Sequence, residues 1–305
     1  MTSLVTIGIP AFKAARLGES IASALSQTYG NIEVVVVNDK SPDDVDSVIE
    51  RFNDSRLHYV VNERNLGAKD PTANWNECLR HARGEFFCLL CDDDVYAPTF
   101  IEELMKLSQR YPNCNVFRSG VCVVDDEGNE VTCFPASPEW EPVDDYMWHI
   151  YRGLRRQTIS EFMLRRSVMD KVGGYVSMPY AWGSDYLSIF TFAGNTGIAS
   201  TGKRLMTFRD SGFNLSSDQK NMDEKLLAFK EYIIRTKQLL LDLHSARADK
   251  ILPFIDIHYR NAIVGHMIEA DKKTLLRIIT HRKRFDVTIG VLLRYILRKT
   301  KMLKG

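Results

Sequence analysis

The sequence predicts an α/β protein in which a mostly parallel sheet becomes mixed, is flanked by helices and is followed by a helical C-terminal appendage. Three observations predict this class. Short apolar runs alternate with amphipathic helical patterns through the first 110 residues, as expected for a parallel sheet covered on both faces. A hairpin pattern then replaces the alternation. Beyond residue 222 the apolar spacing is helical.

The alternating part begins with the apolar run LVTIGIP, which predicts a strand at residues 4–10 that is ended by its proline. A helix with one apolar face follows, and Gly30 is a candidate for its end. The later elements are, in order, a strand at 32–39, a helix at 43–52, a strand at 57–61, a polar loop at 62–71, a helix at 72–83, a strand at 85–90 and a helix at 98–110. Gly84 is expected to end the helix at 72–83 as a C-cap.

From residue 114 the pattern changes, because residues 115–134 predict a hairpin that turns at Asp126-Glu127-Gly128. Helical patterns then cover 223–244, 251–280 and 286–302. We therefore expect two domains. Residues 1–220 would contain the sheet, and residues 221–305 would form a helical region with a basic amphipathic tail.

The composition is that of an ordinary globular protein, with 305 residues and 45% hydrophobic content. No apolar stretch reaches the roughly 18 residues of a membrane span, and the N-terminus lacks the pattern of a signal peptide. Six cysteines are few for this length, which fits a reducing compartment. We therefore expect a cytoplasmic protein without disulfides. Cys88 and Cys91 form a C-x-x-C, but on a strand they would face opposite sides, which favours buried thiols over a shared metal.

The stretch EFFCLLCDDDVYAP places three consecutive carboxylates, Asp92, Asp93 and Asp94, directly after an apolar strand. One reading is a helix-capping turn, since an aspartate there can accept backbone N–H bonds. Capping explains one or two aspartates more easily than three, which repel one another. A divalent cation would neutralise that repulsion, and the carboxyl end of a strand is where open α/β sheets bind ligands. The turn therefore favours a Mn²⁺ or Mg²⁺ site that accommodates a diphosphate.

Several motifs, taken in order, resemble the inverting family 2 glycosyltransferases of the GT-A fold. They are VTIGIPAFK, SIASALSQTYGNIEVVVVNDKSPDD, NERNLG, NWNECLRHARGEFFCLLCDDDVYAPTFIEEL and WGSDYLSIF, and they span roughly residues 4–215. The resemblance implies a nucleotide-sugar donor held by residues 1–110 and an acceptor side at 111–220. It also implies a DxD-type turn that carries Mn²⁺ or Mg²⁺, and a later acidic residue that acts as the base.

On the donor side, the resemblance places the backbone around Pro10 and Ala11 against the nucleoside. Phe12 is included, although PAFK departs from the usual P-x-Y-N in its last two residues. Asp39, in VVNDKSPDD, corresponds to the aspartate that contacts the base of the nucleotide, with a helix-start aspartate as the alternative. Asn65, in NERNLG, is also assigned to the donor.

At the carboxylate turn, the first position of the family's DSDD form falls on Cys91, so the aspartates take the remaining places. Asp93 is then the best metal ligand, with Asp94 beside it and Asp92 as a ribose contact. Arg209, in FRDSGF, is assigned to the leaving diphosphate.

The resemblance implies that Asp185, in YAWGSDYLSIF, is the catalytic base, although as a helix cap it would need no catalytic role. It would take the proton from an acceptor hydroxyl that attacks from the face opposite the nucleotide, so that the anomeric centre inverts. The implied function is transfer of a sugar, with UDP the commonest donor nucleotide, in the assembly of a bacterial surface polysaccharide or glycoconjugate.

Two other functions remain open at the level of the sequence. A nucleotidyltransferase can share the fold and the metal, but AFKAARLGES lacks the Gly-rich cluster that usually holds the triphosphate. A non-catalytic nucleotide-sugar binding module would keep Asp39 and Asp93 and would not need Asp185. A dehydrogenase is not expected, because no G-x-G-x-x-G follows the first strand.

The last 35 residues are strongly basic. Residues 271–305 contain eleven Lys or Arg against two Asp, a net charge of +9, which leaves −8 for residues 1–270. With Asp286 as a predicted N-cap, this tail reads as an amphipathic basic helix. It would bind an anionic membrane surface, peripherally on the inner face of the cell membrane, where a lipid-linked saccharide acceptor would lie. A helix packed on the body is the alternative. Nucleic acid is not expected as a partner.

Overall fold

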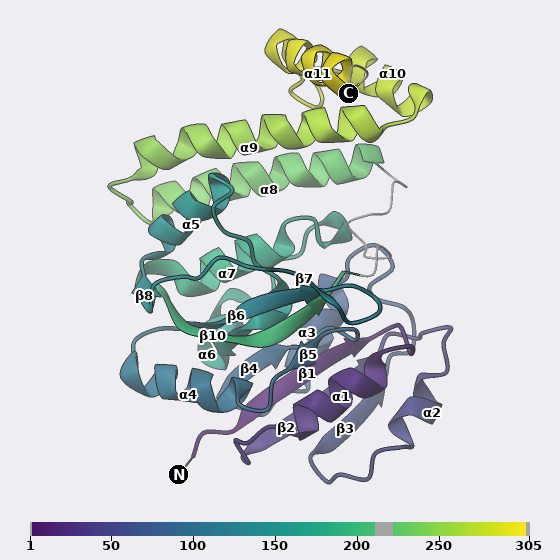
Figure 1. Cartoon of the computed structure of the whole chain (residues 1–305), viewed down its shortest axis with the longest axis vertical. Coiled ribbons are helices and arrows are strands. Elements are labelled where there is room, and N and C mark those ends of the chain that lie inside the picture. Colours follow the sequence, from purple (N-terminus) through teal and green to yellow (C-terminus); the bar gives the residue numbers. More distant parts are fainter. Residues whose placement is uncertain (1, 211–221, 303–305) are drawn as a thin grey trace. The chain divides into compact units, whose positions relative to one another are not determined.

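The computed structural model describes residues 2–210 and 222–302, and it contains two compact units, Met1–Asn214 and Leu215–Gly305. Both units are drawn in Figure 1. The domain boundary predicted at residue 220 lies outside the described residues.

The N-terminal unit is built on a ten-stranded mixed sheet within residues 2–210. Its strands are β1 (Val5–Ala11), β2 (Ile32–Asn38), β3 (Leu57–Val61), β4 (Phe86–Leu89), β5 (Val95–Tyr96), β6 (Val116–Val124), β7 (Glu130–Cys133), β8 (Trp140–Glu141), β9 (Phe162–Arg165) and β10 (Ile198–Arg209). Their order is β3-β2-β1-β4-β9-β6-β10-β5, with β7 paired to β6 and β8 to β10.

The first four strands in that order are parallel, and the sheet becomes mixed where β9 pairs antiparallel with both β4 and β6. The predicted mixed α/β class is therefore confirmed. The parallel strands are apolar because they are covered on both faces: residues 34–37 of β2 are at most 1% exposed.

The helices of this unit are α1 (Leu17–Leu25), α2 (Val45–Ile49), α3 (Thr72–Arg80), α4 (Phe100–Arg110), α5 (Val143–Tyr151), α6 (Arg166–Val172) and α7 (Ser184–Ala193). Side chains of α1, α2 and α4 share one hydrophobic core with β1, β2 and β4. The other face of β1 meets α3 at Gly8, where an added Cβ would lie 2.9 Å from Cys78 Cβ and 2.6 Å from Phe87 Cζ. The glycine inside this strand therefore allows α3 and the Phe87 ring to approach the sheet.

Gly84 does not end a helix as predicted. The helix α3 ends at Arg80, and Gly84 lies beside β1, where an added Cβ would be 2.6 Å from the backbone nitrogen of Thr6. Its backbone N–H donates to Thr6 Oγ1 at 2.9 Å. The absence of a side chain therefore serves close backbone packing at this position.

The C-terminal unit is helical among its described residues, as predicted, and comprises α8 (Met222–Asp242), α9 (Ala248–Glu269), α10 (Lys272–Thr280) and α11 (Ile289–Met302). The single helix predicted over 251–280 is instead two helices. Ala270 is extended, with φ −62° and ψ 141°, and Asp271 caps α10 by accepting from the backbone N–H of Thr274. A single N-cap residue is enough to break a helix in this way. The apolar spacing stays helical on both sides of Asp271, so it gave no sign of the break.

Asp286 is likewise not the N-cap of the last helix. It has a positive φ of 51° and forms an ion pair with Lys230 at 2.8 Å. Thr288 Oγ1 instead accepts from the backbone N–H of Val291 at 3.3 Å. No helix within the described residues is both long enough and apolar enough to cross a bilayer.

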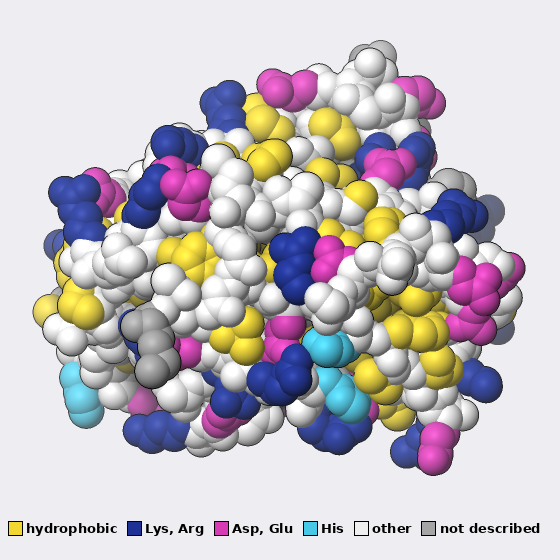
Figure 2. All heavy atoms as spheres, turned by 90° about the horizontal axis from the view of Figure 1, so that it is seen from below, with side chains coloured by type: hydrophobic (Ala, Val, Ile, Leu, Met, Phe, Trp, Pro, Cys, Tyr) yellow, Lys and Arg dark blue, Asp and Glu magenta, His cyan; other side chains and the backbone are white. Residues whose placement is uncertain are grey.

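One face of the protein shows an ordinary mixed surface. In Figure 2, Lys and Arg side chains lie interspersed with Asp and Glu side chains and with small hydrophobic areas. Neither sign of charge dominates that view.

Candidate active site

The three aspartates form a turn between β4 and the short strand β5, beside the end of β1. Asp92 Oδ2 accepts hydrogen bonds from the backbone N–H groups of Phe12 and Lys13, at 2.8 and 2.7 Å. Burial raises the pKa of Asp92 to about 6, against the effect of these two bonds. Asp92 therefore fixes the backbone of Phe12 and Lys13, the two residues that follow β1.

Asp94 is held even more firmly and is 1% exposed. Its Oδ2 accepts from Ser160 Oγ at 2.6 Å, and its Oδ1 accepts from the backbone N–H of Arg209 at 3.3 Å. Burial, followed by repulsion from Asp93, raises its pKa well above the usual value. Both oxygens are thus engaged within the protein, and Asp94 joins β4 to β10 and to the residues before β9.

Asp93 is the most open of the three carboxylates. Its side chain is 15% exposed, and its Oδ2 lies 3.5 Å from Lys13 Nζ, which is itself 44% exposed. This long contact with an exposed cationic side chain leaves a hard oxygen ligand at the carboxyl end of β4. The chemistry of this group fits Mn²⁺ or Mg²⁺, which bind proteins through one or two carboxylates and leave positions for phosphate oxygens.

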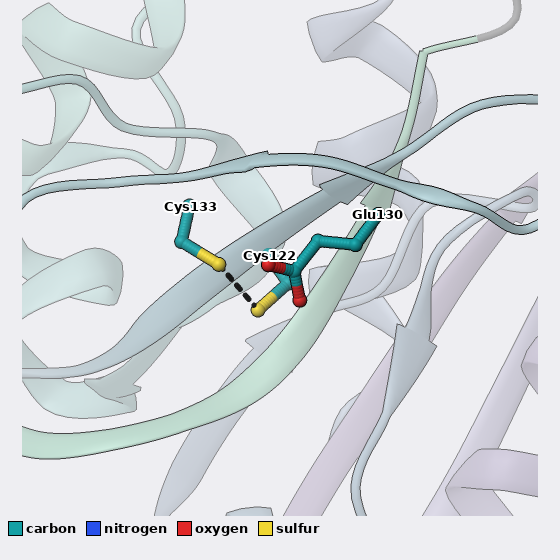
Figure 3. A group of neighbouring side chains, drawn as sticks. All are labelled: Cys122, Glu130 and Cys133. Atoms are coloured by element: carbon teal, nitrogen blue, oxygen red, sulfur yellow. Dashed lines mark hydrogen bonds between the residues drawn. The ribbon is translucent and has the colours of Figure 1, made fainter.

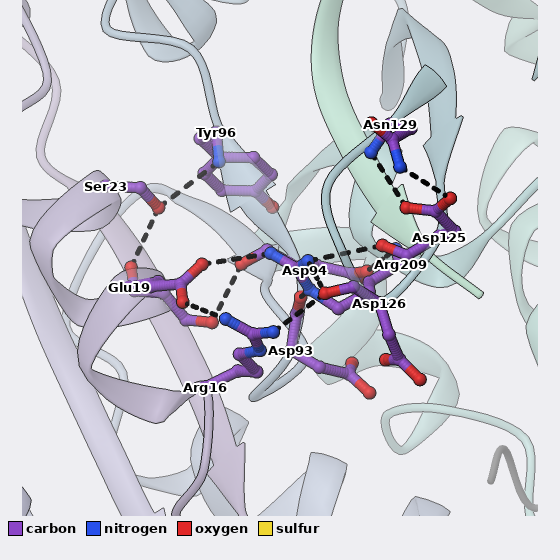
Figure 4. A network of polar contacts seen from close by, with 11 residues as sticks. Arg16, Glu19, Ser23, Asp93, Asp94, Tyr96, Asp125, Asp126, Asn129 and Arg209 are labelled. Atoms are coloured by element: carbon purple, nitrogen blue, oxygen red, sulfur yellow. Dashed lines mark hydrogen bonds and ion pairs between the residues drawn. The ribbon is translucent and has the colours of Figure 1, made fainter. Parts of the chain in front are cut away.

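Arg209 lies at the centre of a polar network that surrounds the turn (Figure 4). Its guanidinium pairs with Glu19 at 2.9 Å and donates to the backbone oxygens of Asp93, Asp125 and Asp126 at 3.4 Å. The side chain is 8% exposed. Its charge is therefore already paired, and its contacts position the turn and the β6–β7 hairpin.

Asp39 follows β2 and organises the loop of the predicted NERNLG motif. Its Oδ1 accepts from Asn62 Nδ2 at 2.8 Å and from the Leu66 N–H at 2.7 Å, and its Oδ2 accepts from the Gly67 N–H at 2.7 Å. An added Cβ at Gly67 would lie 2.8 Å from Asp39 Oδ2. The exposed Asn65 thus lies on a loop whose position Asp39 fixes.

The β1 end lies beside Asp39, because the Asp39 N–H donates to the Ala11 carbonyl at 2.9 Å. Ala11 is buried, Pro10 is partly buried, and the Phe12 side chain is 41% exposed. An exposed aromatic ring next to two backbone N–H groups held by Asp92 gives a flat apolar surface at the edge of the site.

Asp185 occupies the first turn of α7 and is partly buried. Burial raises the pKa of its carboxyl to about 7, although backbone N–H groups of its own turn act in the opposite direction, and Glu161 adds repulsion. A carboxylate with a pKa near neutrality is matched to the work of a general base. The residues just before it are conformationally unusual, with positive φ at Tyr180, Ala181 and Gly183.

The structure brings most of these residues together. Asp92, Asp93, Asp94, Arg209 and the β1 end share one hydrogen-bond network, as described above. Asp39 and Asn65 join it through Ala11. The segment before Asp185 meets the Asn65 loop where the Tyr180 N–H donates to the Lys69 carbonyl at 2.7 Å. A second link runs through the turn at Ile159–Glu161, where Glu161 repels Asp185 and the neighbouring Ser160 donates to Asp94 at 2.6 Å.

Reasoning from the sequence missed three residues of the network: Lys13, Glu19 and Ser160. Lys13 could have been predicted, because a positive charge shortly after the first strand is a candidate contact for a phosphate. Glu19 appeared only as a helical residue, and Ser160 is 66 residues from its partner Asp94. Nothing local in the sequence indicates such a contact.

The family model of Glycosyl transferase family 2 matches residues 6–174, which is more than half of the chain and includes the carboxylate turn. The chain belongs to glycosyl transferase family 2. Relatives within family 2 include an Escherichia coli protein named UDP-Glc:alpha-D-GlcNAc-diphosphoundecaprenol beta-1,3-glucosyltransferase WfgD. It is 34% identical over 118 residues, covering 38% of this chain and 45% of the relative.

A Campylobacter jejuni protein named GalNAc(5)-diNAcBac-PP-undecaprenol beta-1,3-glucosyltransferase is 32% identical over 41% of this chain and 40% of its own length. An uncharacterized glycosyltransferase of Rickettsia prowazekii is 33% identical over 43% of this chain and 40% of its own length. The chain thus spans less than half the length of these curated relatives.

Solved structures show the same fold. A crystal structure of S. aureus TarS residues 1–349 has a TM-score of 0.69 and 18% identity, and it covers 93% of this chain and 80% of that one. At this identity the likeness concerns the fold, and the predicted GT-A-like class of family 2 is confirmed.

Proposed function

We propose that this protein is a metal-dependent inverting glycosyltransferase that transfers a sugar from a UDP-sugar to a hydroxyl of a lipid-linked saccharide. One observation carries the proposal: of three adjacent carboxylates at the end of β4, two are engaged by the protein, whereas among residues 2–210 and 222–302 the Asp93 carboxylate is held only by a 3.5 Å contact with Lys13. This division leaves a single hard ligand where a nucleotide-sugar would bind.

The donor is supported by the site and by the relatives. TarS, which shares the fold, has been crystallised with UDP and with UDP-GlcNAc, and the E. coli relative is named for UDP-Glc. In this chain, the exposed Phe12 ring and the Asn65 loop, which Asp39 fixes, would border the nucleoside. Asp92 would act mainly by holding the backbone of residues 12 and 13.

The cation would bind at Asp93 and not at Asp94, because both oxygens of Asp94 accept hydrogen bonds within the protein. Bound there, Mn²⁺ or Mg²⁺ would neutralise the diphosphate and favour its departure. Lys13, within 3.5 Å of Asp93, is a second positive charge available to the same phosphates. Arg209 would contribute by fixing the turn, since its own charge is paired with Glu19.

Asp185 would be the base. In its ionised form it accepts the proton of the acceptor hydroxyl as that oxygen attacks the anomeric carbon, and the bond to the diphosphate breaks on the opposite side. A pKa of about 7 keeps the carboxylate ionised in about half of the molecules at neutral pH and basic enough to take the proton. One displacement inverts the anomeric centre and requires no covalent intermediate.

The acceptor would lie at a membrane surface. The E. coli and C. jejuni relatives are both named for undecaprenol-linked acceptors. The helix α11 has four exposed apolar side chains along one face, at 55 to 67% exposure: Ile289, Leu293, Ile296 and Leu297. Its other face packs on α9, with Val291 1% exposed.

Exposed cations flank that apolar face. Arg294 and Arg298 are exposed on α11, and Leu276 on α10 adds an apolar side chain that is 62% exposed. Apolar side chains surrounded by cations match an anionic bilayer, which would attract the helix and bury its apolar face. We propose that α10 and α11 hold the enzyme peripherally on the cytoplasmic face of the membrane.

The experiment that tests the activity is a screen of nucleotide sugars for hydrolysis that depends on Mn²⁺ or Mg²⁺, followed by transfer to an undecaprenol-linked saccharide. Turnover of a UDP-sugar with an inverted product supports the proposal. Release of pyrophosphate from a nucleoside triphosphate would indicate a nucleotidyltransferase instead. Donor binding without hydrolysis or transfer would indicate a binding module.

A further inference from the structure

Two cysteines and a carboxylate meet on the β6–β7 hairpin, outside the site described above. Cys122 of β6 faces Cys133 of β7, with their Sγ atoms 2.9 Å apart, and Glu130 directs its carboxylate toward them (Figure 3). One ligand atom from each of the three residues lies within 4.8 Å of the others. Both cysteines are partly exposed, so the group is accessible from solvent.

The backbone is arranged so that the three side chains share one face of the hairpin. Cys122 pairs with Cys133 and Val123 with Thr132, but Val124 pairs with Glu130, so Val131 is an extra residue on β7. In a regular strand, residues 130 and 133 would point to opposite faces. The bulge at Val131 therefore turns the Glu130 side chain to the face of the two sulfurs, which is how bulges re-aim side chains next to sites.

The register also brings the sulfurs together. The Phe134 N–H donates to the Val121 carbonyl at 3.0 Å, so the adjacent pair, Cys122 and Cys133, is a non-hydrogen-bonded pair. In such pairs the Cα atoms are only about 4.5 Å apart and the side chains are closer than in hydrogen-bonded pairs. Both thiols thus reach one point in space without movement of the backbone.

The three groups carry no compensating cation in the interactions described for them. Groups that disfavour one another's ionised forms are stabilised together by a divalent cation that binds all of them.

We propose that Cys122, Cys133 and Glu130 bind a thiophilic divalent cation of the Zn²⁺ class, with water completing the coordination. Two sulfurs and one carboxylate oxygen are ligands typical of Zn²⁺ and unlike the all-oxygen surroundings of Asp93. Binding releases one proton from each thiol to solvent, while the carboxylate is already ionised. Sulfur atoms around tetrahedral Zn²⁺ are about 3.8 Å apart, so the thiols need to separate by about 0.9 Å through side-chain rotation.

A cation bound by these three residues would stabilise the β6–β7 hairpin, which contacts the candidate active site. Its turn is closed by the Asn129 N–H, which donates to Asp125 Oδ1 at 2.8 Å. The carbonyls of Asp125 and Asp126 accept from Arg209, and that of Asp126 also accepts from Arg16 at 2.8 Å. A cation that joins β6 to β7 would therefore stabilise the segment that positions Arg209.

The test uses the full chain, reduced with a phosphine and freed of metal by a chelator, and titrates it with Co²⁺ alone and then with Zn²⁺. We expect a thiolate-to-Co²⁺ charge-transfer band in the near ultraviolet, which Zn²⁺ abolishes by displacement. A cation bound at Asp93 has no sulfur ligand and gives no such band, so catalytic metal does not contribute. Zn²⁺ should also raise the unfolding temperature.

Glu130→Gln is the decisive variant, because Glu130 is exposed and its loss should not affect folding. We expect Co²⁺ affinity to fall by about tenfold or more, whereas Glu127→Gln, an exposed carboxylate on the turn of the same hairpin, should bind normally. Cys133→Ser should lose the band, and Cys114→Ser should keep it.

The absence of the band in the parent, its persistence in Cys133→Ser, or equal affinity in Glu130→Gln would overturn the proposal. A disulfide between Cys122 and Cys133 that persists in reduced glutathione would also overturn it, because the sulfurs would then be unavailable to a cation.

Discussion

Asp93, Asp92 and Asp94 are adjacent in sequence, yet within the described part of the chain only the Asp93 side chain lacks a hydrogen bond shorter than 3.5 Å. Replacing it should therefore change ligand binding more than stability. We expect Asp93→Ala to remove the Mn²⁺- or Mg²⁺-dependent binding of donor and nearly all transfer, while its unfolding temperature equals or exceeds that of the parent, because repulsion within the turn is relieved.

Donor binding by calorimetry and thermal unfolding would check this. Asp126→Ala is the matched control, since the Asp126 side chain is exposed and the hydrogen bonds described for this residue use its backbone carbonyl. If Asp93→Ala retained metal-dependent activity near the level of the parent, the cation would have to bind elsewhere.

The proposal that Asp185 is the catalytic base predicts a dependence of the rate on pH. We expect Asp185→Asn to keep donor affinity within a few-fold and to lower the transfer rate by about 10²- to 10⁴-fold, as for a lost general base. In the parent, kcat/KM should rise as pH passes through about 7, because the ionised form is the active one. A parallel collapse of donor affinity in the variant would assign Asp185 to nucleotide binding or to structure.

The same carboxyl should lower stability at high pH. Its pKa rises from 3.8 unfolded to about 7 folded, so the folded state binds the extra proton and stability falls as pH increases between these values. The full difference corresponds to at most about 4 kcal/mol. Asp185→Asn should thus unfold at a higher temperature than the parent at pH 8, with the gap closing below about pH 4. An equal gap at both pH values would contradict the raised pKa.

At the level of elements, periodicity predicted most helices and strands, because buried strands and amphipathic helices leave apolar patterns in the chain. Breaks between elements were harder to predict. The stop at Ala270 depends on one extended residue and an Asp cap, and the hairpin bulge at Val131 leaves no mark on the apolar pattern. Because the bulge could not be predicted, the contact of Glu130 with the two cysteines could not be predicted from the sequence either.

The exposed apolar face of α11 yields a prediction about membranes. We expect the double substitution Leu293→Ser and Ile296→Ser to weaken sedimentation with liposomes that contain anionic lipid, because both side chains are more than half exposed and would enter the bilayer. Leu241→Ser on α8, at 50% exposure, is the control. Equal sedimentation of the parent and the double variant would exclude this face as the contact.

Point substitutions are preferable to truncation after Thr280 for this test. Truncation would also remove Phe285, Val287 and Val291, which are at most 3% exposed, and would disturb the packing of the C-terminal unit.

The net charge of the whole chain is distributed unevenly, since residues 271–305 carry +9 and residues 1–270 carry −8. If the tail meets anionic lipid, added salt should weaken liposome binding through screening, while hydrolysis of a soluble donor should change little. Sedimentation across a salt series, with donor hydrolysis measured in the same buffers, would check this. Binding that is insensitive to salt, or equal on neutral lipid, would contradict an electrostatic contribution.

The topology of the whole sheet was only partly predictable. The parallel strands β1 to β4 follow from the alternation of strands and helices, but nothing in the sequence indicates that β9 pairs between β4 and β6. Its pairing is accompanied by contacts such as that of Ser160 with Asp94, which join residues far apart in the chain. The position of Asp94 in the site depends on that insertion.

The insertion of β9 also affects how the protein is made. The last residue of β4 is Leu89, and its antiparallel neighbour ends at Arg165. At a synthesis rate of about 5 to 20 residues per second, the ribosome needs about 4 to 15 seconds to produce the residues between them. During that interval one side of the nascent parallel sheet lacks its partner and can pair with other chains. The order of translation therefore sets how long this edge of β4 stays unpaired while the chain is being made.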